Sequence, residues 1–375
     1  MTSAVGFTLI TSRDALVDAV ERWRSASEIA LDTEFVFERT YRPRPGLVQL
    51  ACDSEVALLD AVALPDLSPL AELLADGAVR KFVHAGGADV ELLERLTGSA
   101  PQPLFDTQVA AVFAGLGSGL SYAAVVAATQ EVALAKSETR TDWTRRPLAP
   151  AQLAYAAEDV SHLLPAARAL RARLAALGRL AWAEEESSAL LGAAESDREV
   201  EPERRLRGLD ALPPRQRAVA RELARWRERE AERLDLARPF LLRDETMLAL
   251  ARRTEVAPGD LARLPGWDAR RHARHANAWL AAHAEAVAVA ARTELPPDPP
   301  RPSRRERERD ERRSHAVADA VTEIARALEL PAELLLSRRQ RQHLLAALDR
   351  GDSPAAHLTG FRRELLAEPL SRLAF

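Results

Sequence analysis

The chain has 375 residues, of which 47% are hydrophobic and 29% are charged. This length predicts two or three domains, and the apolar content excludes a wholly disordered chain. No stretch approaches the roughly 18 uninterrupted apolar residues of a membrane span, and the N-terminus lacks a secretion signal, so we expect a soluble cytoplasmic protein without a membrane partner. Because Cys52 is the only cysteine, an internal disulfide and a cysteine-rich zinc site are excluded, and any metal must be held mainly by oxygen.

The charged residues are unevenly distributed along the chain. Residues 1–200 carry 18 basic and 28 acidic side chains, a net charge of −10, whereas residues 201–375 carry 34 and 28, a net charge of +6. An acidic half joined to a basic half fits a cation-dependent active site beside a polyanion-binding surface. Ordinary solvated helices explain the pattern equally well, so charge alone does not decide between them.

The first half of the chain predicts an α/β fold. Residues 29–59 contain three apolar runs separated by turn residues, which indicates an antiparallel β-meander. From Leu67 onwards, helical patterns alternate with short apolar runs at 81–85 and 103–108, which favours a mixed sheet with helices on its faces. Residues 107–190 then have helical periodicity, with interruptions by a glycine-rich and a polar stretch.

The second half predicts only helices. Acidic stretches within 184–203 mark the expected boundary, and the proline-rich stretch 295–303 cannot continue a helix. We therefore expect three domains, at residues 1–200, 205–294 and 304–375.

Two acids stand out on the first predicted strand. Asp32 and Glu34 are two residues apart, so both side chains project from one face of the strand. In a central strand, two like charges a few ångströms apart would raise one pKa unless a cation neutralised them. The alternative is a strand end with both acids in solvent, which is the more common arrangement for an isolated pair.

Two further acids fall on predicted helices. Asp89 follows the diglycine Gly86-Gly87 and continues the apolar stripe of its helix, which places it toward the strand end. Tyr155 and Asp159 are four residues apart and share a helical face. Taken singly, Asp89 is explained as a first-turn residue favoured by the helix dipole, and Tyr155 and Asp159 as a residue at the edge of the core and a surface acid.

Together these residues form a known pattern. A strand D-x-E, a helix-start Asp and a helical Y-x-x-x-D resemble the DEDD superfamily of 3′-to-5′ exonucleases, in its tyrosine subgroup, since Ala154 stands where the histidine subgroup has its histidine. Over roughly residues 8–170 the chain is also similar to the ribonuclease D family. The similar stretches are DTEFVFERTYRPRPGLVQL, KFVHAGGADVELL, LFDTQVAA, KSETRTDW and YAAEDVSHLLP.

The resemblance implies a fold and a domain organisation. It implies an α/β, ribonuclease-H-like exonuclease domain with a mixed sheet at 1–200, followed by two all-α domains. Residues 205–294 resemble a helical domain of the helicase-and-RNase-D C-terminal (HRDC) type, and residues 304–375 resemble a shorter second copy more faintly. In such domains a basic face is taken to hold nucleic acid, although charges of alternating sign also simply solubilise a helix.

The resemblance also implies a mechanism. Two divalent cations, Mg²⁺ or Mn²⁺, would assist hydrolysis of the phosphodiester at a free 3′ end and release 5′-mononucleotides. Asp32 would bridge both ions, Glu34 and Asp159 would complete the first site, and Asp89 would hold the second largely through water. Tyr155 would orient the attacking water, since its unperturbed pKa near 10 makes it a poor base.

Residues near these acids are predicted to contact substrate. Thr33 and Phe35 flank the strand carboxylates, and Phe35 could pack on the terminal base or sugar. Lys136 and Arg140 are candidates for phosphate contacts. His84 ends a predicted strand and is included in the substrate site, although a hydrogen-bonded core histidine is the more common situation.

Three rival functions follow from the same residues. A DNA 3′ exonuclease would use the same carboxylates, and the sequence displays no recognisable reader of the 2′-hydroxyl. A non-catalytic nucleic-acid scaffold would tolerate loss of one acid, yet all four are present. A purely helical interaction protein leaves the strand acids without purpose. We therefore expect an exoribonuclease, monomeric, acting on RNA with a free 3′ end such as tRNA precursors.

Overall fold

The computed structural model describes residues 6–134, 141–199, 201–294 and 303–373, and the side chains of 192–199 lie outside that description. By its internal contacts the chain divides into two compact units. The first unit contains Met1–Glu34, Pro45–Ala194 and Arg301–Phe375, and the second contains Phe35–Arg44 and Glu195–Pro300. The second unit therefore interrupts the first in the sequence.

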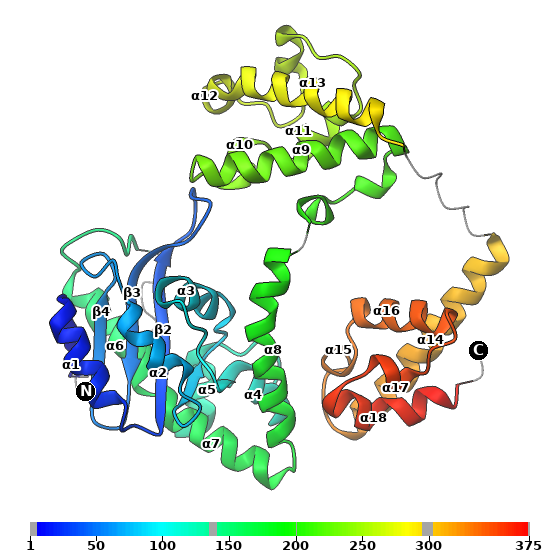
Figure 1. Ribbon diagram of the computed structural model, residues 1–375. Coiled ribbons are helices and arrows are strands. Elements are labelled where there is room, and N and C mark those ends of the chain that lie inside the picture. Colours follow the sequence, from blue (N-terminus) through cyan, green and yellow to red (C-terminus); the bar gives the residue numbers. More distant parts are fainter. Residues whose placement is uncertain (1–5, 135–140, 200, 295–302, 374–375) are drawn as a thin grey trace. The chain divides into compact units, whose positions relative to one another are not determined.

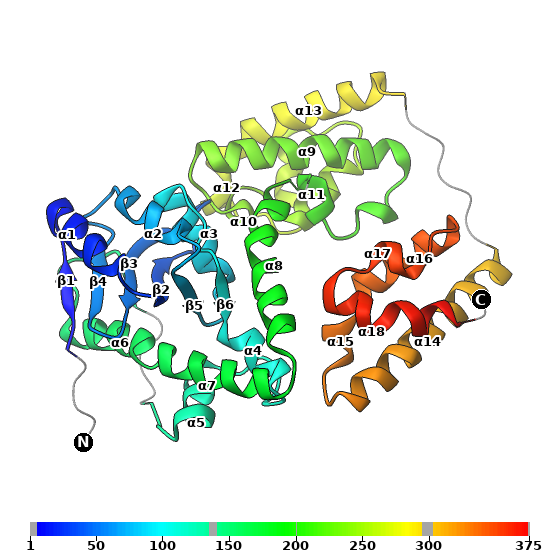
Figure 2. The same cartoon turned by 60° about the horizontal axis from the view of Figure 1, so that its bottom comes forward.

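A six-stranded mixed sheet forms the centre of the first unit, as the sequence predicts. Its order is β1-β4-β3-β2-β5-β6, which Figure 2 shows from left to right. Strands β3 and β4 pair antiparallel, whereas β1 with β4, β2 with β5 and β5 with β6 pair parallel. The strands are β1 (Thr8–Ile10), β2 (Glu28–Val36), β3 (Arg44–Ala51), β4 (Val56–Asp60), β5 (Arg80–Val83) and β6 (Leu104–Asp106).

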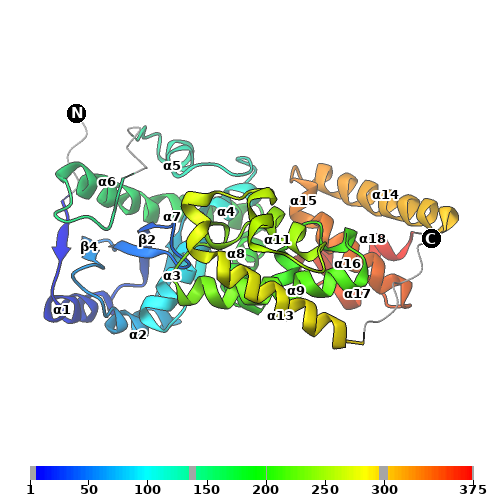
Figure 3. The ribbon, with the colours of Figure 1, turned by 90° about the horizontal axis from the view of Figure 1, so that it is seen from above.

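Helices cover both faces of this sheet (Figure 3). One face packs on α1 (Arg13–Trp23), α2 (Ala71–Ala75) and α3 (Gly87–Thr97), with α2 preceded by the 3₁₀ helix η1 (Ser68–Leu70). The other face packs on α5 (Tyr122–Gln130), α6 (Pro150–Ser161) and α7 (Leu163–Ala176). Alternate residues of β2 serve the two cores: Ile29 and Leu31 face the first set of helices, and Ala30 faces the second.

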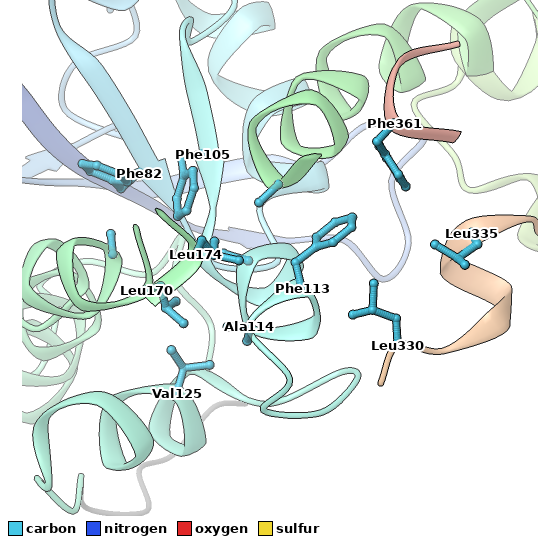
Figure 4. Packing of buried hydrophobic residues seen from close by; sticks show 14 of the residues in the cluster. Phe82, Phe105, Phe113, Ala114, Val125, Leu170, Leu174, Leu330, Leu335 and Phe361 are labelled. Atoms are coloured by element: carbon cyan, nitrogen blue, oxygen red, sulfur yellow. The ribbon is translucent and has the colours of Figure 1, made fainter. Parts of the chain in front are cut away.

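The C-terminal helices share a core with the sheet domain. Phe361 meets Phe113 edge to face at 5.4 Å and stacks on Trp182 at 5.7 Å between ring centroids. Figure 4 shows Phe113, Leu330, Leu335 and Phe361 converging there. The helices concerned are α4 (Thr107–Phe113), α8 (Leu180–Glu199), α14 (Arg304–Ala327), α15 (Ala332–Leu335), α16 (Arg338–Asp349), α17 (Pro354–His357) and α18 (Gly360–Ser371).

The predicted boundary falls inside a helix. Helix α8 continues through the acidic stretch that begins at Glu184, and the unit division comes at residue 194. Residues 304–373 belong with the sheet domain by their contacts. The division of the sequence into three domains stays a prediction, and the structure adds that two of these segments are joined by one apolar core.

The second unit is a helical domain built around Trp279. Helix α13 lies along α9, as Figure 1 shows, and Trp279 of α13 is fully buried, with its ring 5.3 Å from that of Trp267 and 5.1 Å from that of His272. Its helices are α9 (Pro214–Arg233), α10 (Arg238–Leu241), α11 (Asp244–Ala251), α12 (Ala269–His272) and α13 (Ala276–Arg292). Its 3₁₀ helices are η2 (Pro202–Arg205), η3 (Leu209–Ala211), η4 (Pro258–Arg263) and η5 (Ala273–His275).

No described helix combines the length and apolarity needed to cross a membrane.

Candidate active site

Asp32 and Glu34 lie in the part of β2 that extends beyond the end of its neighbour β5. Strand β2 pairs with β5 only at Glu28–Ala30, and β5 ends at Val83, so Asp32 and Glu34 stand just past the end of β5. Ligands in sheets with parallel strands commonly bind outside the carboxyl ends of those strands. By strand alternation both acids share the face of Ala30, which is the face that α6 covers. Both are partly exposed, so they border open space at the sheet edge.

Helix α6 brings the third acid to this edge. One oxygen each of Asp32, Glu34 and Asp159 lies within 4.8 Å of the others. Within the described part of the chain, no other group of three His, Cys, Asp or Glu side chains approaches in this way. The Tyr155 phenol and the Asp159 carboxylate, one helical turn apart, lie close enough for the carboxylate to raise the pKa of the phenol. The structure thus joins four of the five predicted catalytic residues directly.

Asp89 approaches from the opposite face of β2. It lies in the first turn of α3, is only 8% exposed, and accepts a hydrogen bond from the Thr33 hydroxyl. Thr33 points away from its two acidic neighbours, because side chains alternate along a strand. Asp89 is therefore outside the three-carboxylate group, but it is near enough for its charge to raise the pKa values of Asp32 and Glu34.

A buried aspartate shapes the turn that leads to Asp89. The carboxylate of Asp106 accepts hydrogen bonds from the amides of Ala85 at 3.1 Å and Gly86 at 2.9 Å, and it also caps α4. A Cβ at Gly86 would lie 2.6 Å from the Cβ of Val83, so this close approach requires glycine. Sequence reasoning missed Asp106, although an Asp before a helix start is a recognisable capping signal.

The acids are held in an environment that disfavours negative charge. Burial, followed by neighbouring carboxylates, raises the pKa of Asp32 well above its usual range and that of Glu34 to about 8. Burial raises the pKa of Asp159 to about 7 and that of Asp89 to about 6. No described basic side chain forms an ion pair with any of the four. Oxygen donors with uncompensated negative charge fit hard divalent cations such as Mg²⁺ or Mn²⁺.

Two tyrosines line the site. Burial raises the pKa of Tyr155 and of Tyr122, and the charge of Asp159 raises both further. The Tyr122 hydroxyl donates to the backbone carbonyl of Glu158 at 3.2 Å and accepts from the amide of His162 at 3.2 Å. Tyr122, which sequence reasoning missed, thus ties α5 to the helix that carries Asp159. Both phenols stay protonated at neutral pH, so they can donate hydrogen bonds but not accept a proton as bases.

The predicted substrate-binding residues have different surroundings. Thr33 is bonded to Asp89, and Phe35 is partly exposed at the start of the segment grouped with the second unit. Both ring nitrogens of His84 have partners, the Thr107 hydroxyl at 3.0 Å and the Leu120 carbonyl at 3.1 Å, as expected of a hydrogen-bonded core histidine. Lys136 and Arg140 lie outside the described residues. Their contacts with substrate stay predictions.

Comparison with known proteins defines the class. Residues 7–175 match the 3′-5′ exonuclease family, and residues 216–282 match the HRDC domain. The chain is 36% identical to ribonuclease D of Escherichia coli (strain K12) over 98% of both chains. It is 41% identical to ribonuclease D of Pseudomonas paraeruginosa over 66% of each. The chain is thus a hydrolase, with the domains of a 3′-5′ exonuclease and an appended helical HRDC domain.

Solved structures agree with this class. The crystal structure of Escherichia coli RNase D, described as an exoribonuclease involved in structured RNA processing, superposes with a TM-score of 0.87 at 34% identity over 98% of both chains. A protein from Bifidobacterium adolescentis superposes with a TM-score of 0.76 at 25% identity, over 97% of this chain and 96% of that one. The chain belongs to the ribonuclease D family, and it is a 3′-5′ exoribonuclease.

Proposed function

We propose that this exoribonuclease trims structured RNA, such as tRNA precursors, from a free 3′ end and releases 5′-mononucleotides. The observation that carries the proposal is the group of Asp32, Glu34 and Asp159, with oxygens within 4.8 Å of one another, beside the phenol of Tyr155. The family relationship supports RNA as substrate, and the processing of structured RNA is attributed to the Escherichia coli relative. We further propose that it acts as a cytoplasmic monomer.

The four carboxylates would hold two divalent cations, Mg²⁺ or Mn²⁺. Asp32, Glu34 and Asp159 would hold one ion, and Asp32, together with Asp89 acting largely through water, would hold the other. Such ions supply an activated water and compensate the charge on the phosphate and the departing oxygen. The raised pKa values support this assignment, because burial, followed for Asp32 and Glu34 by the neighbouring carboxylates, disfavours the charged forms, and no described basic side chain compensates them.

Tyr155 would place the water for attack. Its phenol lies beside the carboxylate of Asp159, and a phenol oxygen can both donate and accept a hydrogen bond. Because burial raises the pKa of this phenol, it remains protonated and orients water through a hydrogen bond rather than removing its proton. Phe35, Lys136 and Arg140 would contact the terminal nucleotide and its phosphates.

Product analysis on a tRNA precursor with a 3′ tail tests this function. We expect stepwise release of 5′-mononucleotides that requires Mg²⁺ or Mn²⁺, stops on addition of a chelator, and fails when the 3′ end is blocked. A DNA strand of matched sequence should be degraded more slowly. Internal cleavage products would contradict exonuclease action, and equal rates on RNA and DNA would contradict the proposed substrate class.

A further inference from the structure

A single arginine organises the segment that leads into α6. Arg146 donates from Nε and Nη2 to the two carboxylate oxygens of Asp60, each at 2.6 Å. It also donates to the carbonyls of Gly46 at 2.8 Å, Trp143 at 2.8 Å and Arg145 at 2.9 Å. Asp60 is buried at the end of β4, so this two-pronged pair fixes residues 143–146 against the sheet.

The arrangement excludes a direct role of Arg146 in holding substrate. A guanidinium has five N–H donors, and the five hydrogen bonds of Arg146 engage all of them within the chain. None is left for an RNA phosphate. The neighbouring Arg145 is exposed, and no hydrogen bond or ion pair of its guanidinium to another described residue is found. The two adjacent arginines therefore offer a natural comparison.

Arg146 fixes the backbone of Trp143, whose indole reaches the site. Trp143 is 2% exposed, and its ring lies 6.1 Å from that of Tyr155 with an angle of 31° between the planes. Gly46 packs directly on Trp143, since a Cβ at Gly46 would lie 2.5 Å from the Trp143 carbonyl oxygen. The start of β3 thus packs on the backbone and Cβ of Trp143, and the indole lies beside the phenol of Tyr155.

A second contact ties the same segment to α6. The Gln152 side chain donates to the Thr141 hydroxyl at 2.9 Å and accepts from the amide of Ala149 at 2.9 Å. Tyr155 follows one turn later on that helix. Its ring therefore lies against Trp143, while its hydroxyl is on the side of Asp159, whose charge raises the pKa of the phenol.

We propose that Arg146 is a positioning residue, which sets the orientation of the Tyr155 phenol by holding Trp143 against it. This inference rests on the proposed role of Tyr155 in placing the attacking water. Removal of the arginine fork would let the indole and the phenol rotate, so the water would lose its alignment while the carboxylates and the RNA contacts remained. Misplacement on the scale of 1 Å lowers an enzymatic rate by about 100-fold.

The test is a double-mutant cycle between Arg146 and Tyr155. Arg146→Lys should lower the single-turnover rate on a 3′-tailed RNA by roughly 10- to 100-fold without changing RNA affinity, since lysine keeps the charge but not the fork. In a Tyr155→Phe background, Arg146→Lys should cause little further loss, because the group it positions is already gone. Arg145→Lys is the matched control and should leave rate and affinity unchanged.

The cycle separates this inference from the proposed function. Additive losses, or a loss of RNA affinity in Arg146→Lys, would overturn the link between Arg146 and Tyr155 and leave the role of Tyr155 intact. An unchanged rate in Tyr155→Phe alone would overturn both. Thermal unfolding of each variant reports whether it is folded.

A second pair of variants serves if Arg146→Lys does not fold. Trp143→Phe keeps an aromatic ring against Tyr155 and should retain the rate within about threefold, whereas Trp143→Leu should lose roughly 10-fold or more. Equal rates in the two variants would overturn the proposal, because the position would then require only apolar bulk.

Discussion

The carboxylates at the end of β2 and the arginines of the HRDC unit, residues 195–300 of the second unit, differ in whether their charges are compensated. Within the described residues, Asp32, Glu34 and Asp159 lie close together without a basic partner, and burial raises their pKa values. In the HRDC unit many cations are paired, as Arg225 is with Glu203 at 2.8 Å and Arg233 with Glu230 at 2.7 Å. Buried acids without a basic partner are typical of functional sites, whereas paired surface charges mostly support the fold.

The largest effect is expected from the removal of one uncompensated charge. Asp32→Asn should abolish turnover, because it removes the carboxylate predicted to be shared by both cations. The metal-free variant should unfold at an equal or higher temperature than the wild type at pH 8, since like-charge repulsion is relieved. Activity assays and calorimetry check both expectations. Glu91→Gln, an exposed change on α3, is the control, and near-normal activity of Asp32→Asn would refute the assignment.

A neutral change tests the phenol. Tyr155→Phe should lower the single-turnover rate by roughly 10- to 1000-fold, the range for losing a positioning or proton-transfer group, while Mn²⁺ affinity stays constant. Quench-flow kinetics and metal titration measure the two effects. Tyr41→Phe removes a phenol that is bonded to Glu228 in the second unit, and it should not change the rate on short substrates. A rate constant equal to that of the wild type would argue against water placement by Tyr155.

The raised pKa values of the acids predict that metal affinity depends on pH. Since the pKa of Glu34 is raised to about 8 and that of Asp159 to about 7, both hold protons at pH 6 that a cation must displace. Metal affinity should therefore rise from pH 6 to 8.5, by up to about tenfold per pH unit for each proton displaced. Titration calorimetry in buffers of different ionisation enthalpy would show the released protons. Affinity that is independent of pH would contradict the shifts.

The same pKa shifts set the stability of the metal-free protein. A carboxyl whose pKa is higher in the native state than near 4 in the unfolded chain binds more protons when native. Its stabilising contribution is complete below about pH 4 and is lost as the pH rises through 7 and 8. The free energy of unfolding should thus fall across this range without metal, and Glu34→Gln should flatten the fall.

The smallest effect is expected from the basic helical unit. Arg270 and Arg274 are exposed near α12, and neither forms an ion pair with an acid in the described part of the chain. Changing both to Gln should weaken binding of a tRNA-sized RNA by roughly 2- to 10-fold and make it less sensitive to salt, with no change of rate on short strands. The same change at Arg204 and Arg233, which pair with glutamates, is the control. If RNA affinity depends on salt equally in this variant and in the wild type, these arginines serve only to solubilise the helices.

The sequence was informative where a signal is local. Apolar runs bounded by turns predicted the strands from β2 to β6, and the D-x-E and Y-x-x-x-D spacings predicted shared faces. Strand β1 has three residues and pairs with β4 some 50 residues away, so no local sequence pattern predicts it. The acids could be grouped only through the resemblance, because the close approach of Asp159 to Asp32 depends on how α6 packs on the sheet.

Contacts between residues far apart in the sequence could not be predicted. Arg146 and Asp60 are 86 positions apart, and neither neighbourhood indicates that the two pair. Likewise, Phe361 looks like an ordinary core residue of a separate helical domain, yet it packs on Phe113 and Trp182. Such contacts are fixed by tertiary packing, which periodicity does not encode.

The shared core around Phe361 has a consequence for biosynthesis. The apolar surface of Phe113 and Trp182 belongs to the sheet domain, but the residues that cover it, up to Leu370, are translated only after the HRDC unit. The nascent chain therefore carries an open apolar face throughout synthesis of the HRDC unit. A message cut short after that unit would yield a protein that retains the clustered acids of the sheet domain and exposes an apolar surface, and exposed apolar surface of this kind promotes aggregation.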